Sequence, residues 1–400
     1  MTESRWYPSR EAALARLHAF LPRAGGAYAR MRNFDFGPED RSNVSGLSPY
    51  IRCRALSEKE VVQRVLQHHT PEAAQKFIQE VCWRTYWKGW LEMRPQVWRQ
   101  YLEDVKALLE TDSQSDAYKR AVAGDTHLKD FNVFARELVE THYLHNHARM
   151  WFASIWIFTL GLPWQLGADF FLRHLLDGDP ASNTLSWRWV AGLQTRGKNY
   201  VATAGNMQKY TAGRLGNHIH LAQKPAPITD SHDLPAPQRL PENDLPPSGR
   251  FGILLHEDDV CADMWLCPDK KPASAAICFP RALYATHSID AEVQAFRQAL
   301  LEDAAGRLER NGIRVTRLYA DIVQGVPAWV ETEKLDAVLM ARPFVGFWDH
   351  LIDAVRAKVK DDIPIRQVRC DWDQQLHPHA THGYFRFRKQ LPKLIKRMQS

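Results

Sequence analysis

The sequence predicts two domains of different class, a mainly helical N-terminal domain and a C-terminal α/β domain with a parallel sheet. Its 400 residues are too many for one hydrophobic core, so two domains are the default expectation. Ten of the fourteen tryptophans lie before residue 190 and none lies between 190 and 264, so the composition changes along the chain. A stretch with seven prolines, residues 224–250, follows that change. We therefore predict domains at 1–222 and 251–400, joined by a Pro-rich linker at 223–250.

The N-terminal domain is predicted to be helical because its apolar residues recur with the 3.6-residue period of an amphipathic helix. Three stretches show this period: REAALARLHAFL, SEKEVVQRVLQHH and AAQKFIQEVCWRTYWKGWLEM, which begin at residues 10, 57 and 73. The net charge of +6 is compatible with nucleic-acid binding without requiring it. No apolar run is long enough to predict a membrane span. Six cysteines without a CxxC pair indicate reduced thiols, as expected for a cytoplasmic protein, and argue against a four-cysteine iron–sulfur cluster.

The C-terminal domain shows an alternation of strand and helix patterns. Strand candidates lie at 251–255, 274–279, 313–318 and 336–340, and helical stretches at 291–310, 346–359 and 386–397. This alternation predicts a parallel, Rossmann-like sheet with helices on both faces. No GxGxxG or Walker-type loop indicates a nucleotide site. Glu257, Asp258 and Asp259 follow the first strand, at the end where α/β sheets bind ligands, but a solvated acidic loop is the favoured interpretation.

Residues 143–189 are the stretch around which the N-terminal domain is organised. Residues 148–160 are almost wholly apolar and too long for a strand, which predicts a buried helix. Asp179 is a candidate N-cap and Pro180 the first residue of the next helix. Burying Asn146 and Arg149 near Asp177 costs free energy unless a large polar group lies among them. This pattern predicts a cofactor pocket, with an ordinary tryptophan-rich core as the alternative.

The order of two motifs in this stretch, YLHNHARM followed by LLDGDPASNTLSWRW, resembles the flavin-binding half of the photolyase/cryptochrome family. The resemblance covers roughly residues 1–212. The C-terminal domain more loosely resembles the antenna domain of that family, including a closing GYFRFRKQLPKL. In the family the antenna domain comes first, whereas here it comes last, so the presence of an antenna chromophore stays open.

The resemblance implies that the helical domain binds FAD. The segment SNVSGLSPY matches the phosphate-binding loop of the family, where hydroxyls and backbone N–H groups at a helix start suit a diphosphate. Taken alone, the loop is more simply a polar turn with capping serines. Gly46 stands where many members place Arg, so one charge contact is expected to be missing. The implied FAD contacts are Tyr28, Arg32, Ser45, Leu47, Ser48, Glu80, Arg84, Asn146, Arg149, Asp177, Asp179 and Asn183, with Arg149 and Asp177 as a buried ion pair.

The resemblance also implies residues for substrate binding and electron transfer. Glu80, Trp83, Met150 and Trp189 match the substrate pocket, and Asn183 matches the residue that faces flavin N5. Trp187 and Trp164 match the inner and middle members of the electron relay. The outer member is not identified, and Trp98, Trp151 and Trp156 are its candidates. Without the resemblance, Glu80 would be a solvated helix residue and the tryptophans core residues.

Two histidine clusters invite a metal interpretation, which the sequence does not favour. His142, His145 and His147 in HYLHNH lack the spacing with an intervening Glu that a zinc peptidase needs. His377, His379 and His382 in HPHATH lie in a turn, and no cysteine or carboxylate completes the set. No metal site is therefore expected.

The function implied by the resemblance is that of a deoxyribodipyrimidine photolyase-like lyase, in which photoexcited reduced FAD transfers an electron to cyclobutane pyrimidine dimers. Asn183 favours repair, because plant cryptochromes usually carry Asp at this position and insect ones Cys. The alternative is a cryptochrome-like blue-light sensor or regulatory flavoprotein without repair activity, favoured by the eroded rim segment TRGKNYVATAGNMQKY. A flavin-free scaffold is the simplest third hypothesis.

The expected partner is DNA that carries pyrimidine dimers, with single-stranded DNA favoured because extruding the dimer from it costs least. Arg188, Arg196, Lys198 and Lys209 are the basic residues expected to hold the DNA backbone. No membrane partner is expected, and the protein is expected to be a monomer.

Overall fold

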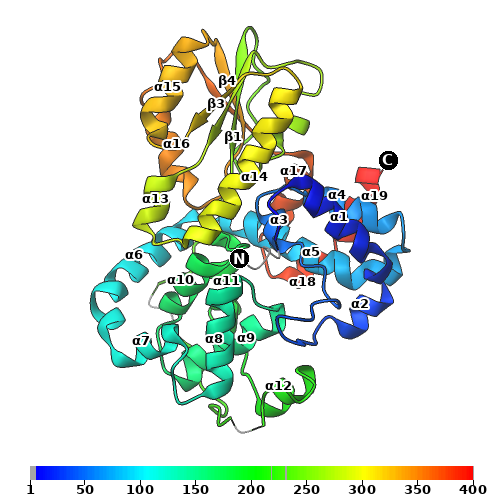
Figure 1. Cartoon of the computed structure of the whole chain (residues 1–400), viewed down its shortest axis with the longest axis vertical. Helices are drawn as coiled ribbons and strands as arrows, with labels where there is room; N and C mark the ends of the chain where they lie inside the picture. The colour runs from blue at the N-terminus through cyan, green and yellow to red at the C-terminus, as the bar shows by residue number, and fades with distance from the viewer. Residues whose placement is uncertain (1–5, 218, 230–231, 400) are drawn as a thin grey trace.

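The computed structural model describes residues 6–217, 219–229 and 232–399. Figure 1 shows a helical body with a sheet domain beside it, which confirms the predicted mainly α and α/β parts of the chain. The helical body contains α1 (Arg10–Phe20), α2 (Gly26–Met31), α3 (Ser48–Arg52), α4 (Glu58–Leu66), α5 (Pro71–Glu92), α6 (Pro95–Thr111), α7 (Asp116–Ala123), α8 (Lys129–Thr141), α9 (Asn146–Ser154), α10 (Trp164–His174), α11 (Pro180–Ala191) and α12 (Ala204–Tyr210). Among the described residues, no helix is both long and apolar enough to cross a membrane.

Local sequence signals define the helices at the centre of this body. The side chain of Asp179 accepts a hydrogen bond from Ser182 N at 2.9 Å, and Pro180 opens α11, as predicted. The buried helix predicted at 148–160 consists of α9 and a π-helical turn at Ile155–Thr159. α11 packs against both α5 and α10, so it lies between other helices of the helical body.

The sheet domain is a five-stranded parallel sheet in the order β3-β2-β1-β4-β5. Its elements are β1 (Phe251–His256), β2 (Ser274–Cys278), β3 (Val315–Leu318), β4 (Ala337–Ala341), β5 (Ile365–Val368), α13 (Arg281–Thr286), α14 (Ala291–Arg310), α15 (Ile322–Thr332) and α16 (Trp348–Arg356). The four predicted strands are present. Two elements were not predicted. In β5 the apolar residues alternate with polar ones over only four positions, and α15 contains Pro327, a residue that is rare inside helices.

Helices cover both faces of the sheet, as predicted. Ile253 and Leu255 belong to the same core cluster as Phe296 of α14, whereas Leu254 belongs to a second cluster with Val326 of α15 and Ile352 of α16. In Figure 1 α14 crosses one face of the sheet and α15 and α16 lie on the other. Successive side chains of a strand point to opposite faces, so β1 is covered on both sides and all six of its residues are buried. Five of the six are apolar or glycine, and the sixth, His256, contacts Ala341 O through Nε2 at 3.0 Å.

The carboxyl end of the sheet is buried against the helical body. Glu257, Asp258 and Asp259 are almost fully buried, so the expectation of a solvated acidic loop is wrong. Arg52 Nη1 lies 2.9 Å from Asp258 Oδ1, and Arg54 Nη1 lies 3.5 Å from Asp259 Oδ2. These guanidinium groups supply the opposite charges that buried carboxylates require. The sheet edge at which α/β proteins bind ligands is therefore in contact with arginine side chains of the helical body.

The residues after β5 leave the sheet and return to the helical body as α17 (Asp371–Leu376), α18 (Tyr384–Arg388) and α19 (Leu391–Gln399). Trp372 Nε1 donates a hydrogen bond to Thr85 Oγ1 of α5 at 2.9 Å. The Pro-rich segment is bound to both parts, since Gln238 N donates to Met93 O at 2.8 Å and Asp244 N to Gln367 O at 3.1 Å. The division at residues 222 and 250 remains a proposal. α17 and α18 pack on α5 although they follow the sheet in sequence.

The contact between α5 and the C-terminal segment leaves no room for a side chain at Gly89. A Cβ atom there would lie 2.9 Å from His377 Cα, which is backbone and cannot turn away. Gly89→Ala is therefore expected to lower the free energy of unfolding by about 1–3 kcal/mol through overpacking, measured by urea denaturation. Gly205→Ala in α12 is the matched control, because its Cβ would meet nothing within 4 Å. Equal stability of the two variants would contradict this prediction.

Candidate functional site

A cavity of about 560 Å³ lies in the helical body between α2, α3, α5, α9 and α11. It has the size of a cofactor or substrate site. Eleven of the twelve residues assigned to FAD line it: Tyr28, Arg32, Ser45, Leu47, Ser48, Glu80, Arg84, Asn146, Arg149, Asp177 and Asn183. The twelfth, Asp179, forms an ion pair with Arg84. Six of the seven residues assigned to catalysis also line it: Glu80, Trp83, Met150, Asn183, Trp187 and Trp189.

The predicted ion pair between Arg149 and Asp177 is present at the wall of the cavity. Arg149 Nη2 lies 3.0 Å from Asp177 Oδ2, and Arg149 Nε donates a hydrogen bond to Leu144 O at 2.9 Å. Burial works to raise the pKa of Asp177, but Arg149 and Arg84 outweigh burial and hold that pKa below its usual range. The other carboxylate oxygen, Asp177 Oδ1, is buried and makes no hydrogen bond within the described part of the protein. Such an atom suits a pocket that receives a large polar ligand.

Asn183 is held in one orientation by a backbone contact. Its Nδ2 donates a hydrogen bond to Ala168 O at 2.7 Å. One N–H of the amide is used there, so Oδ1 and the second N–H remain for a ligand. Asn183 therefore offers the cavity a hydrogen-bond acceptor for an N–H group.

The loop before α3 forms another part of the cavity wall. Gly46 has φ +59, a left-handed conformation that favours glycine. A Cβ atom at Gly46 would lie 3.0 Å from Arg16 Nη1 and 3.1 Å from the Trp6 ring, so Arg16 occupies the space beside this glycine. Arg16 thus places a basic group next to the loop, although an Arg at position 46 is missing. The sequence analysis did not find Arg16, because α1 precedes the loop by about thirty residues and shows only an ordinary helical pattern.

Glu80 and Tyr28 share the wall formed by α2 and α5. Glu80 Oε1 lies 2.8 Å from Arg32 Nη1, and burial raises the pKa of Glu80 above its usual range while Arg32 opposes that shift. The Tyr28 ring packs edge-on against Phe77, with ring centroids 5.1 Å apart. Glu80 is therefore a half-buried, ion-paired carboxylate at the cavity, and not the solvated helix residue that its sequence context alone suggests.

Two tryptophans of the cavity are each backed by a tyrosine that sequence analysis missed. The rings of Trp83 and Tyr384, from α18, are stacked with centroids 3.5 Å apart and an interplanar angle of 12°. The rings of Trp189 and Tyr200 are stacked with centroids 5.7 Å apart. Tyr384 lies 301 positions after Trp83, so no local pattern could reveal this contact. The stacking fixes the Trp83 ring beside the cavity.

The residues assigned to electron transfer divide between two places. Trp187 lines the cavity, and its ring meets that of Trp156 edge-on with centroids 6.3 Å apart. Trp164 lines a second cavity, of about 800 Å³, against α6. There its ring stacks on Tyr101 with centroids 5.8 Å apart, and Tyr101 stacks on Trp98 at 5.2 Å. Of the three candidates for the outer relay member, Trp156 contacts Trp187, and Trp98 reaches Trp164 through Tyr101. The third, Trp151, donates a hydrogen bond to Asn206 Oδ1 at 3.0 Å.

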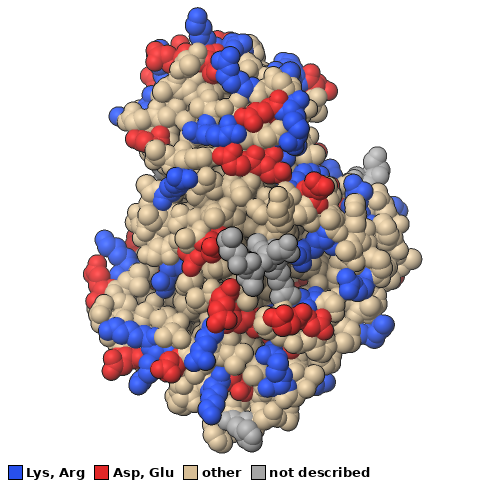
Figure 2. Space-filling model, in the orientation of Figure 1, with Lys and Arg blue, Asp and Glu red and all other residues tan. Residues whose placement is uncertain are grey.

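Of the four basic residues expected to hold DNA, Arg188 is misassigned. It is buried, with its guanidinium carbon 5.9 Å from the centroid of the Trp164 ring, because this position of α11 faces α10 and not solvent. Arg196, Lys198 and Lys209 are exposed. Figure 2 shows basic and acidic side chains interspersed over the face in view, so no broad patch of positive charge marks that face.

The two sequence clusters of histidines do not converge. His145 Nδ1 accepts a hydrogen bond from His147 N at the start of α9, and His147 Nδ1 contacts Asn33 O at 2.9 Å. His142 lies instead beside α10 and α14. In the other cluster only His377 is buried, and His379 and His382 are exposed.

His377 provides a pH-dependent contribution to stability. It contacts Glu92 Oε2 at 2.8 Å and Asp373 Oδ1 at 3.3 Å. Burial lowers the pKa of His377, but the two carboxylates outweigh burial and raise it above the ordinary value of 6.5. A raised histidine pKa stabilises the fold fully below the unfolded pKa, and this stabilisation is lost as the pH rises through the folded pKa. The urea midpoint is expected to fall above pH 6.5 more steeply in the wild type than in His377→Gln, and parallel pH profiles would contradict this assignment.

Comparison with known proteins identifies the region that contains the cavity. A sequence model described as the FAD binding domain of DNA photolyase matches residues 77–220, which include most of α5 and all of α9 and α11. The deoxyribodipyrimidine photo-lyase of Alkalihalophilus pseudofirmus is 30% identical over 189 residues, which are 46% of this chain and 38% of that protein. The enzyme of the same name from Thermus thermophilus is 32% identical over 186 residues, 46% of this chain and 43% of that protein. The chain thus spans less than half the length of these relatives.

A solved structure of a bacterial class III photolyase from Agrobacterium tumefaciens is 25% identical in sequence to this chain. The superposition has a TM-score of 0.44 and covers 52% of this chain and 44% of the other.

Proposed function

Because the helical domain belongs with the FAD-binding domains of the photolyase/cryptochrome family, we propose that this chain is a light-driven DNA-repair flavoprotein that splits cyclobutane pyrimidine dimers. The observation that carries the proposal is the composition of one cavity. Glu80, Trp83, Met150, Asn183 and Trp189 all line it. A carboxylate and indole rings in one cavity suit an extruded base, which is recognised by stacking and by hydrogen bonds to its edge.

The remaining polar groups of the cavity suit FAD. Bound FAD supplies the photoexcited electron donor for dimer cleavage, and the protein supplies binding and orientation. In this proposal Arg149 and Asp177 hold the flavin ring, which Asp177 accepts from through Oδ1, an atom with no hydrogen bond of ordinary geometry among the described residues. Asn183 accepts an N–H of the ring through Oδ1 while Ala168 O holds its amide nitrogen.

The substrate is proposed to enter between the backed tryptophans. Trp83 rests on Tyr384 and Trp189 on Tyr200, so each ring is fixed from one side. A fixed aromatic ring loses little conformational entropy when a base stacks on it, and such stacking contributes about 1–3 kcal/mol per base. Arg196, Lys198 and Lys209 are the exposed cations proposed to contact phosphates. Few cations predict weak, salt-dependent binding, with single-stranded DNA preferred because its bases need no unpairing.

The test is a repair assay with the reduced, FAD-loaded protein at low salt. Dimer-containing oligonucleotides, single-stranded and duplex, are illuminated, and restored thymines are counted. Wild type is expected to repair the single-stranded substrate faster, and Glu80→Ala and Trp83→Ala are expected to lose at least about tenfold in rate when compared at equal FAD content. Glu72→Ala, at the exposed start of the same helix, is the matched control.

A blue-light sensor or regulatory flavoprotein without repair activity is the second candidate. The burial of Arg188 favours it, because one of four expected phosphate contacts is removed from the rim. A protein that binds FAD and responds to light, but restores no thymines on either substrate, would refute repair and support the sensor. A protein without flavin absorption would refute both functions.

A further inference from the structure

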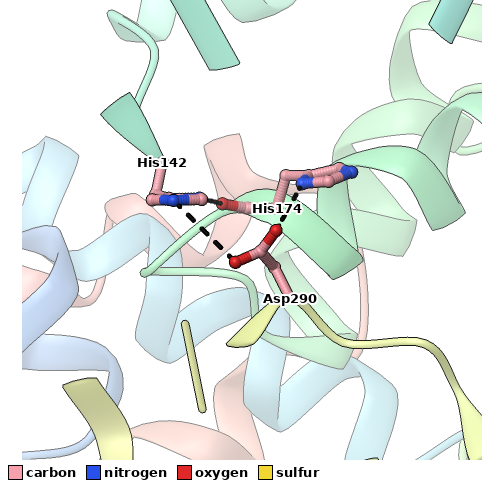
Figure 3. Close-up of side chains that lie close together, drawn as sticks. All are labelled: His142, His174 and Asp290. Atoms are coloured by element: carbon pink, nitrogen blue, oxygen red, sulfur yellow. Dashed lines mark hydrogen bonds and ion pairs between the residues drawn. The ribbon is translucent and has the colours of Figure 1, made fainter. Parts of the chain in front are cut away.

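Two histidines and an aspartate converge where the helical body meets the sheet domain, outside the cavity described above. Figure 3 shows the imidazoles of His142 and His174 directed toward the carboxylate of Asp290. His142 ends α8, His174 is the last residue of α10, and Asp290 is the N-cap of α14. Their three ligand atoms lie within 4.8 Å of one another.

The distances between these groups are too long for strong direct contacts. His142 Nε2 lies 3.9 Å from Asp290 Oδ1, and His174 Nδ1 lies 3.3 Å from Asp290 Oδ2. His174 Nδ1 is buried and makes no hydrogen bond of ordinary geometry among the described residues. Ligands bound to zinc at about 2.0–2.2 Å in a tetrahedron lie roughly 3.3–3.6 Å apart. The 3.3 Å separation falls in this range and the 3.9 Å separation is slightly longer, so a small movement of the His142 side chain would place the three groups around one ion.

The hydrogen bond at the other nitrogen of His142 defines its tautomer. Its Nδ1 lies 3.1 Å from the carbonyl oxygen of His174, which can only accept, so Nδ1 carries the proton. In the neutral ring Nε2 then carries the lone pair and faces a carboxylate, and a cation between these two acceptors would stabilise that arrangement. An N–H donated to a backbone carbonyl is also the usual outer contact of a metal-binding histidine.

The backbone holds the donors in position. His142 has φ +53, a left-handed conformation in which glycine is the favoured residue after a helix. Its N–H donates to Leu138 O at 2.9 Å, and its carbonyl accepts from Leu176 N at 3.0 Å. Asp290 Oδ1 accepts from Glu292 N at 2.9 Å.

The surrounding charges permit a cation. Arg173 is the nearby basic group, and it is ion-paired with Asp169 at 2.9 Å and donates to the Tyr118 hydroxyl at 3.0 Å. The three side chains are 14%, 18% and 24% exposed, so an ion can reach them from solvent.

We propose that His142, His174 and Asp290 form a binding site for one divalent transition-metal ion, with water as the fourth ligand, that ties the helical body to the sheet domain. Two imidazoles and one carboxylate in tetrahedral spacing are the donor set of a three-ligand zinc site, and Zn²⁺ is the ion we assign. The ion would join elements that the sequence separates by more than a hundred residues.

The test is calorimetric titration of the tag-free, chelator-treated full chain with Zn²⁺, together with thermal unfolding. Wild type is expected to bind one equivalent and to unfold at a higher temperature with Zn²⁺ than without it. His174→Ala and Asp290→Asn are each expected to weaken binding at least tenfold and to abolish the thermal shift. His379→Ala, which removes an exposed histidine elsewhere, is expected to behave as wild type.

Two results would overturn the proposal. One is the absence of saturable Zn²⁺ binding in the wild type, which would make the cluster a polar contact between domains. The other is one-equivalent binding that both His174→Ala and Asp290→Asn retain, which would place the ion elsewhere. Because binding is read directly, the outcome does not depend on FAD content or on repair activity.

Discussion

Replacing Arg54 with methionine is expected to lower the free energy of unfolding by about 3–5 kcal/mol, because it leaves buried carboxylates without their cation. Arg54 Nη2 contacts both oxygens of Asp373, at 2.8 and 2.7 Å. The same guanidinium reaches Glu58 at 3.2 Å and Asp259 at 3.5 Å. All four side chains are at most 5% exposed, so water cannot replace the lost charge.

The control for this substitution is Arg317→Met. Arg317 contacts Glu302 and Glu309, each at 2.9 Å, but all three side chains are more than a third exposed. Ion pairs of this kind contribute about 0–1 kcal/mol. Arg54 has φ +53, and methionine would carry the same backbone strain, so the difference between the variants reports the charges. Urea unfolding that shows equal losses for both substitutions would contradict the argument.

Arg149→Leu is expected to cause loss of bound flavin together with a loss of stability of about 3 kcal/mol. The substitution removes the guanidinium that lies 3.0 Å from Asp177, whose side chain is 2% exposed. It also removes a cation from the wall of the cavity. The ratio of flavin to protein absorbance after gel filtration measures the first effect, and urea unfolding measures the second.

The double variant Arg149→Leu, Asp177→Leu separates these two effects. Replacing both members of a buried ion pair with apolar residues often restores stability. The double variant is therefore expected to regain stability but not flavin. Full flavin retention in Arg149→Leu would contradict the assignment of this pair to the cofactor.

What the sequence predicted well was local in origin. Asp179 and Pro180 specify a helix start by their own chemistry, and α11 begins there. The apolar run at 251–255 needed no partner to be identified as a strand. The cavity was also predictable, because its residues occur in an order that resembles one family.

What the sequence could not predict depends on contacts between distant segments. Glu257, Asp258 and Asp259 form an acidic run of the kind that is usually solvated, and contacts with distant residues such as Arg52 and Arg54 explain its burial. The pattern of α11 does not distinguish the buried Arg188 from an exposed one. His142 was weighed with its sequence neighbours His145 and His147, whereas the groups that surround it come from α10 and α14.

The return of α17 and α18 to α5 has a consequence for how the chain folds during synthesis. The ribosome releases α5 long before it adds Tyr384, the ring that stacks on Trp83. Until then the apolar face of α5 around Trp83 and Tyr86 has no cover from that segment, and exposed apolar surface on a nascent chain promotes aggregation and chaperone binding. Formation of this wall of the cavity must therefore follow translation of the entire sheet domain, so the helical body cannot mature independently of the segment that follows it.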